Sequence, residues 1–110
     1  WKGRRVCPWV SLYTEGESHT LHNHPKAVVA GTYYPYADRD SVDIRFKNPS
    51  SNLIQMADHW IDGNSPELWH FHSPRTGHMN VWPSWLEHQI GRQGPVPNNR
   101  SRIAVSFNFQ

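Results

Sequence analysis

Cysteine is almost absent from this sequence, since Cys7 is the only one among 110 residues. A single thiol cannot form an internal disulfide, which fits a reducing compartment such as the cytoplasm. Long apolar runs are absent as well. No stretch approaches the roughly 18 apolar residues that a membrane helix needs, and no signal peptide opens the chain. We therefore predict a protein that has no membrane interaction.

A strong surplus of one charge is also missing. Eleven lysine and arginine residues stand against nine aspartate and glutamate residues, which gives a formal net charge of +2. Nucleic acid is not indicated as a partner, because such a partner calls for concentrated positive charge. The chain does contain eight histidines and six tryptophans, together with four tyrosines and four phenylalanines. Histidine and aromatic residues at this density indicate a lined pocket or a metal site.

The local patterns favour strands over helices. Nine prolines and seven glycines interrupt the chain too often for long helices. Residues 102–109 alternate strictly, with Arg102 on one face and Ile103 on the other, and residues 42–47 alternate in the same way. Further short runs rich in β-branched and aromatic residues predict strands. They cover residues 27–35, 68–72 and 79–82.

These patterns predict one all-β domain over residues 1–110, with about seven or eight short strands in a sandwich or barrel and few or no helices. Only residues 53–60 have helical spacing, and a short helix or an irregular strand fits them equally well. Because translation does not begin at tryptophan, Trp1 indicates that residues upstream are missing.

His22-Asn23-His24 is the first candidate for chemistry. In a strand, residues i and i+2 project to the same side, so His22 and His24 could share one metal ion. An isolated pair of this kind is also compatible with two exposed polar residues on an edge strand. The motif alone leaves both interpretations open.

The second half of the chain adds a third histidine and an arginine. His88 follows a proline turn, and Arg102 opens a predicted strand fourteen positions later. Two close histidines, a later histidine and then an arginine is the order in which non-haem iron oxygenases supply metal ligands and an anchor for an acidic co-substrate. Arginine suits the anchor because its planar fork binds a carboxylate through two parallel hydrogen bonds.

Six short motifs occur in an order that resembles a known family. They are Trp9, His22-Asn23-His24-Pro25, Gly31-Thr32-Tyr33-Tyr34, Ile44-Arg45-Phe46-Lys47-Asn48-Pro49, Pro83-Ser84-Trp85-Leu86-Glu87-His88 and Arg102-Ile103-Ala104-Val105-Ser106-Phe107-Asn108. Over residues 9–108 the chain resembles the 2-oxoglutarate- and iron(II)-dependent oxygenases related to prolyl hydroxylases that occur in marine bacteria and their phages.

The resemblance implies a fold, an activity and a location. The implied fold is a double-stranded β-helix, which is a jelly-roll or cupin-like barrel with Fe(II) and 2-oxoglutarate at its open end. The implied activity is hydroxylation of an unidentified small-molecule or peptide substrate, with succinate and CO2 as co-products. The implied location is the cytoplasm of a bacterium or of a phage-infected host cell.

The resemblance also implies roles for single residues. His22 would be the first iron ligand, His88 the distal ligand and Arg102 the partner of the 2-oxoglutarate side-chain carboxylate, aided by the Tyr34 hydroxyl. Most oxygenases of this fold have Asp or Glu as the second ligand, whereas this chain has His24.

The departure at the second ligand has three explanations. His24 binds the iron, a nearby carboxylate such as Glu17 or Asp43 replaces it, or the site has lost its usual redox chemistry. We favour His24 because its spacing from His22 places both side chains on one side of a strand.

Two other functions compete with the oxygenase. One is a three-histidine dioxygenase of cupin type that does not use 2-oxoglutarate, and the other is a non-catalytic jelly-roll binding or structural module. Helices that back the barrel normally precede this region in the family, so we expect that they are missing here. A homo-oligomer partner would then cover exposed apolar surface, for instance around Val10 and Leu12.

The remaining histidines have less specific explanations. His70-Phe71-His72 is a second His-x-His motif, which fits another metal site, side chains in the pocket, or ordinary strand alternation with Trp69 and Phe71 packed inside. His19 is isolated in sequence, and we expect it on the surface or in a hydrogen bond.

Overall fold

A computed structural model describes residues 4–96 and 102–110. Among these residues it contains eight strands and one short helix. The elements are β1 (Val6–Tyr13), β2 (His19–His22), β3 (Val29–Ala37), β4 (Ile44–Lys47), α1 (Ser51–Ala57), β5 (Trp69–His72), β6 (Met79–Pro83), β7 (His88–Ile90) and β8 (Arg102–Phe109).

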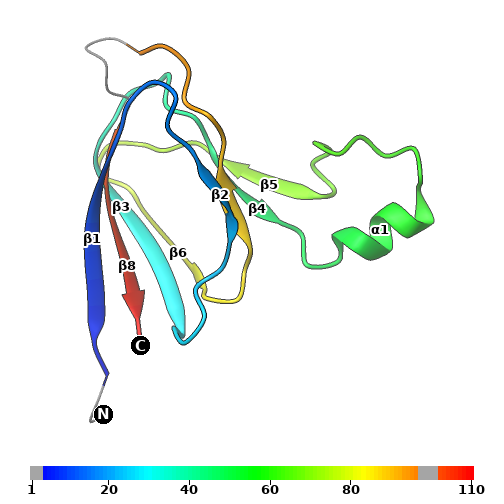
Figure 1. Cartoon of the computed structure of the whole chain (residues 1–110), viewed down its shortest axis with the longest axis horizontal. Helices are drawn as coiled ribbons and strands as arrows, with labels where there is room; N and C mark the ends of the chain where they lie inside the picture. The colour runs from blue at the N-terminus through cyan, green and yellow to red at the C-terminus, as the bar shows by residue number, and fades with distance from the viewer. Residues whose placement is uncertain (1–3, 97–101) are drawn as a thin grey trace.

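The strands form two four-stranded antiparallel sheets. Sheet A has the order β1-β8-β3-β6, and sheet B has the order β2-β7-β4-β5. Figure 1 shows the strands of sheet A on one side of the molecule and those of sheet B on the other. Consecutive strands lie in different sheets, as in a jelly roll, except for β4 and β5, which pair with each other within sheet B. The predicted all-β, cupin-like architecture is therefore confirmed.

The inner face of sheet A carries its polar residues. Antiparallel pairing places Tyr13 opposite Arg102 and Thr32 opposite Ser106. Side chains of directly opposed residues lie on the same face, so these four share the face that looks toward sheet B. Arg102 is fully buried there. The predicted alternation of residues 102–109 is correct, and its polar side is the one that faces inward.

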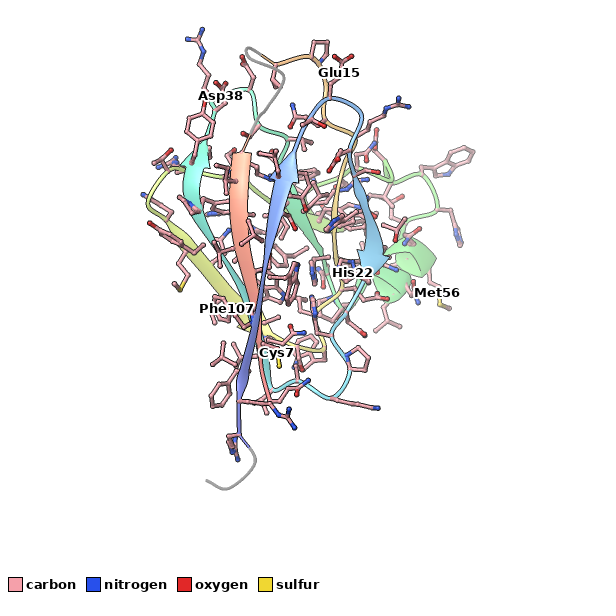
Figure 2. The ribbon with its side chains drawn as sticks, turned by 60° about the vertical axis from the view of Figure 1, so that its left-hand side comes forward. Cys7, Glu15, His22, Asp38, Met56 and Phe107 are labelled. Carbon is pink, nitrogen blue, oxygen red and sulfur yellow. The ribbon has the colours of Figure 1, made fainter. Side chains whose placement is uncertain are left out.

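The outer face of sheet A is apolar and uncovered in the described part of the chain. Val10 is 70% exposed and Val81 is 58% exposed, although both lie within strands. Gly31 lies on this face opposite Phe107, whose ring occupies the place that a Cβ at Gly31 would take. Phe107 is labelled in Figure 2. The register places these residues on this face: Val6, Pro8, Val10, Leu12, Val29, Gly31, Tyr33, Met79, Val81, Pro83, Ile103, Val105, Phe107 and Phe109.

Sheet B places the second His-x-His motif on its inner face. His70 lies opposite Phe46 and His72 lies opposite Ile44, whose side chain is buried in the core. The expectation that Trp69 and Phe71 pack inside is therefore wrong. Phe71 is 42% exposed, and the Trp69 ring packs against Arg45, whose guanidinium carbon lies 4.8 Å from the ring centroid. At this edge of the sandwich the inner face borders a cavity rather than a closed core.

Helix α1 belongs to an arm that projects away from the two sheets (Figure 1). It overlaps the segment of helical spacing, but it begins before Leu53 and ends before Trp60. Its apolar side chains do not pack on the sheets, since Leu53 is 68% exposed and Met56 is 71% exposed. Figure 2 shows Met56 at the edge of the molecule. Within the described residues, no helix is long and apolar enough to cross a membrane.

Candidate metal centre

Three histidines meet where β2 and β7 pair. His22 at the end of β2 lies directly opposite His88 at the start of β7, and their ring centroids are 4.4 Å apart. His24 lies two residues beyond His22, with its Nε2 atom 3.2 Å from Nε2 of His88. The ligand atoms of the three side chains all lie within 4.8 Å of one another. Figure 2 labels His22 on β2. The structure thus brings together the three histidines that were predicted as metal ligands.

His24 reaches this cluster from a loop and not from a strand, which corrects the expectation of a His-x-His strand pair. Strand β2 ends at His22, and the chain then turns through Lys26, whose φ is +69°. The His24 amide donates a hydrogen bond of 3.0 Å to the Ser84 carbonyl, and its ring lies beside Trp9. These contacts hold His24 toward β7 after strand pairing has ended.

Backbone hydrogen bonds orient two of the imidazoles. Nδ1 of His22 donates to the Thr20 carbonyl over 2.7 Å, and Nδ1 of His88 donates to the Leu86 carbonyl over 2.9 Å. A carbonyl can only accept, so the proton of each ring lies on Nδ1. The Nε2 lone pairs of His22 and His88 remain available to a metal ion, and partners of this kind are common behind metal-bound histidines.

Burial lowers the pKa of two of the three candidate ligands. The pKa of His88 is lowered to about 4, mainly by burial, with smaller contributions from His22 and His24. The pKa of His24 is also lowered, first by burial and then by His22. Neutral imidazole is the form that coordinates a metal. The cluster is therefore ready to bind a cation near neutral pH without first losing protons at His24 and His88.

The donor geometry fits a single metal ion. Two imidazole nitrogens that bind one ion at about 2.1 Å and at right angles lie about 3 Å apart, close to the His24–His88 distance of 3.2 Å. Glu17 and Asp43, the carboxylates considered as substitutes for His24, do not belong to the cluster. Among the described residues, the available ligand set is three imidazole nitrogens.

Arg102 lies in the same cavity and carries unused donors. Its Nη1 donates to the Val42 carbonyl over 2.7 Å, and its guanidinium carbon lies 4.0 Å from the centroid of the Tyr13 ring. Nε and Nη2 are buried and have no hydrogen-bond partner within the described residues. Buried charges in proteins are normally paired, so this arrangement fits a bound anion.

The cavity connects the arginine with the histidines. It is narrow, with a volume of about 40 Å³, and its wall includes Arg102, Tyr34 and all three histidines. Tyr34 is buried, and this burial raises the pKa of its hydroxyl. Its ring centroid lies 5.8 Å from the guanidinium carbon. The structure thus places both predicted co-substrate residues in one cavity with the candidate ligands.

Other cavity residues could not be assigned from sequence motifs. Tyr13 packs on Arg102 because the two are opposite each other across β1 and β8, and this pairing depends on strand register. His19 also lines the cavity, with its Nδ1 atom 3.2 Å from the Tyr13 hydroxyl. Ser106 shared the predicted face of Arg102, so strand alternation was a signal that could have identified it.

Comparison with protein families agrees with this geometry. Residues 8–108 match the family model described as "Putative 2OG-Fe(II) oxygenase". The chain belongs to this family. The 2OG-Fe(II) oxygenase membership confirms the family resemblance that the sequence motifs indicated.

Three solved structures share the fold of this chain. A prolyl-4-hydroxylase from Pseudomonas putida is 16% identical, with a TM-score of 0.63, and the match covers 96% of this chain and 51% of that one. HygX from Streptomyces hygroscopicus, whose structure has iron bound, is 12% identical, with a TM-score of 0.59 and coverage of 96% and 58%. A cupin domain from Bordetella pertussis is 11% identical, with a TM-score of 0.52 and coverage of 97% and 81%.

These likenesses establish the fold of the family member but not its substrate. The chain spans about half the length of the prolyl-4-hydroxylase that it matches. None of the curated proteins matches this 2OG-Fe(II) oxygenase family member.

Proposed function

We propose that this protein is a 2-oxoglutarate- and Fe(II)-dependent dioxygenase that hydroxylates an unidentified small molecule or peptide. Its family membership supports this class of reaction. The observation that carries the proposal is Arg102, a buried cation with two unpaired nitrogen donors in the cavity that also contains the three histidines. A dicarboxylic acid suits such a cavity, because one end can bind the metal and the other can bind the guanidinium.

His22, His24 and His88 would hold the iron in this proposal. With 2-oxoglutarate and dioxygen, the metal would supply oxidative decarboxylation, in which 2-oxoglutarate yields succinate and CO2 while one oxygen atom is inserted into a C–H bond of the substrate. Three neutral ligands leave the charge of Fe(II) uncompensated. The negative co-substrate would supply the missing charge, so we expect iron retention to depend on it.

Arg102 would bind the distal carboxylate of the co-substrate. Val42 fixes one nitrogen of the guanidinium, and the Tyr13 ring packs against its plane. Nε and Nη2 then remain as a two-donor edge that matches the two oxygens of a carboxylate. Tyr34 would line the same end of the cavity, and burial would exclude water from the ion pair.

An anaerobic titration tests this function. Fe(II) and then 2-oxoglutarate are added to the protein, and we expect the weak visible charge-transfer band that accompanies bidentate chelation of iron by a 2-oxo acid. The variants His22→Ala and His88→Ala should lose the band, whereas the control His59→Ala, on an exposed histidine outside the cluster, should retain it. If Fe(II) binds but no band develops, co-substrate chelation is excluded.

The all-histidine ligand set favours a second candidate function. A cupin-type dioxygenase would use the same three histidines without 2-oxoglutarate, and a cupin domain shares this fold. Succinate formation separates the two, because only the first function couples substrate oxidation to 2-oxoglutarate consumption. A non-catalytic binding module would be indicated instead if the purified protein failed to bind Fe(II).

A further inference from the structure

We propose a second ligand site between the edge strands β5 and β6, suited to a small aromatic carboxylate. The cavity there has a volume of about 650 Å³, within the range of small-molecule sites. It lies at the opposite edge of the sandwich from β1 and β2, because β5 ends sheet B and β6 ends sheet A. Nothing in the proposed oxygenase function uses this cavity.

The second His-x-His motif lines this cavity. His70 and His72 lie opposite Phe46 and Ile44, so both imidazoles lie on the inner face of sheet B. Metal binding is not indicated here, since these two histidines do not form a group of three potential ligands with any other described residue. The motif instead contributes two polar side chains to an otherwise largely apolar wall.

The polar groups of the wall are mainly hydrogen-bond donors. His70 and His72 each carry a ring N–H, and the Asn80 side chain carries an amide group. Asn80 and Trp82 both belong to the cavity wall. Trp82 is almost fully buried, with an exposed fraction of 7%. Lys47 also borders the cavity, although it forms an ion pair with Glu87.

Acidic side chains are missing from the described wall. The imidazole N–H groups of His70 and His72 can donate hydrogen bonds to a ligand that carries acceptor oxygens. A carboxylate is the acceptor that matches a wall with two imidazoles, a lysine and no acid. This charge complementarity is the reason to propose an anion over a neutral ligand.

The apolar part of the wall favours an aromatic ligand. Phe46, Trp82 and Leu86 pack together in this wall, and Met79 and three prolines also line it. Flat rings stack on such surfaces and bury a large area with little loss of conformational freedom. The proposed ligand therefore combines one aromatic ring system with one carboxylate.

This site is distinct from the metal cluster. The rings of Phe46 and Trp82 lie between the two, with centroids 5.9 Å and 4.9 Å from that of His88. Trp82 lines both cavities. A ligand in the second cavity would thus contact the side chain that packs against His88 without occupying a metal position.

Isothermal titration of the full chain, free of metal, with indole-3-acetate tests the proposal. We expect saturable binding of indole-3-acetate and about tenfold weaker binding of the neutral indole-3-acetamide. The double variant His70→Ala and His72→Ala should bind indole-3-acetate about tenfold more weakly than the parent protein. His59→Ala is the matched control and should bind like the parent protein. Circular dichroism establishes that each variant is folded.

Saturating 2-oxoglutarate is added in a second titration and should not displace the aromatic acid. Displacement would place the ligand at Arg102 and overturn the proposal. Equal affinity for indole-3-acetate and indole-3-acetamide would also overturn the proposal. So would an unchanged affinity of the double variant for indole-3-acetate. So would the absence of binding up to about 1 mM, because a built site should exceed that affinity. None of these outcomes depends on iron chemistry or on turnover.

Discussion

Nη1 of Arg102 donates a hydrogen bond of 2.7 Å to the carbonyl oxygen of Val42. The amide of the same Val42 donates to Oε1 of Gln93 over 2.8 Å, and Nε2 of Gln93 donates to the Asp40 carbonyl. Gln93 is buried and thus holds the backbone segment that fixes Arg102. A side chain outside the cavity therefore determines where the guanidinium lies.

Gln93→Ala should raise the KM for 2-oxoglutarate by about tenfold, because loss of one buried hydrogen bond costs about 1–3 kcal/mol and frees the Val42 segment. Iron affinity should change much less, because the histidines are held by other contacts. The control is Gln55→Ala on the exposed helix α1. Equal losses of iron and co-substrate affinity would indicate general destabilisation in place of positioning.

Arg102→Gln should raise the 2-oxoglutarate requirement by about a hundredfold, since it removes a charge-assisted pair worth about 3 kcal/mol. Arg102→Lys should restore only part of this affinity, because an ammonium cannot form the two-donor fork. Steady-state succinate assays at varied 2-oxoglutarate measure both effects. An unchanged requirement in a folded Arg102→Gln protein would place the co-substrate elsewhere.

His88→Ala should abolish iron-dependent succinate formation, because it removes the ligand that pairs with His22 and contacts His24. His59→Ala provides the comparison, as the same substitution at an exposed histidine outside the cluster. Metal content measured beside activity separates loss of iron from loss of chemistry. Succinate formation at the parental rate in His88→Ala would remove His88 from the ligand set.

The metal-free protein should lose stability as the pH falls from about 6.5 to about 4. The folded pKa of His88 is lowered to about 4, so the unfolded chain binds the proton first and acid favours unfolding. The stability lost over this window should be about 2 kcal/mol after allowance for solvent screening. Urea unfolding in the presence of a chelator measures it. His88→Gln should flatten this pH dependence, and an equally steep profile in that variant would exclude His88 as its source.

The outer face of sheet A predicts self-association, in line with the homo-oligomer expected from the sequence. Four strands of this length present on the order of 500 Å² in projection, and the face has no charge to repel a second copy. Light scattering should detect a dimer that Val10→Lys disrupts. Leu53→Lys, which adds the same charge on α1, should leave it intact. A monomeric parent protein would contradict this prediction.

Sequence patterns predicted side-chain direction within a strand but not which residues of different strands are paired. Alternation in residues 102–109 identified which residues share a face with Arg102, because successive side chains in a strand point to opposite faces of the sheet. The packing of Tyr13 on Arg102 depends on which residues of β1 and β8 are paired, and no local pattern encodes this register.

The second His-x-His motif illustrates the same limit. The two-residue spacing of His70 and His72 established that they share a face of the strand, but not which face points inward. Apolarity suggested that Trp69 and Phe71 point inward, yet pairing with Phe46 and Ile44 places the imidazoles there. The outer face of sheet A also departs from the rule that apolar side chains point inward, since its apolar residues lie on the exposed side of the sheet.

Strand β8 pairs with β1 on one side and with β3 on the other, although β1 and β8 are the first and last strands of the described residues. Sheet A therefore joins segments from opposite ends of the sequence, and this long sequence separation makes the search for native contacts slow. Refolding should be limited by the docking of β8. The arginine at its first position would then be delivered to the cavity only in the final step of folding.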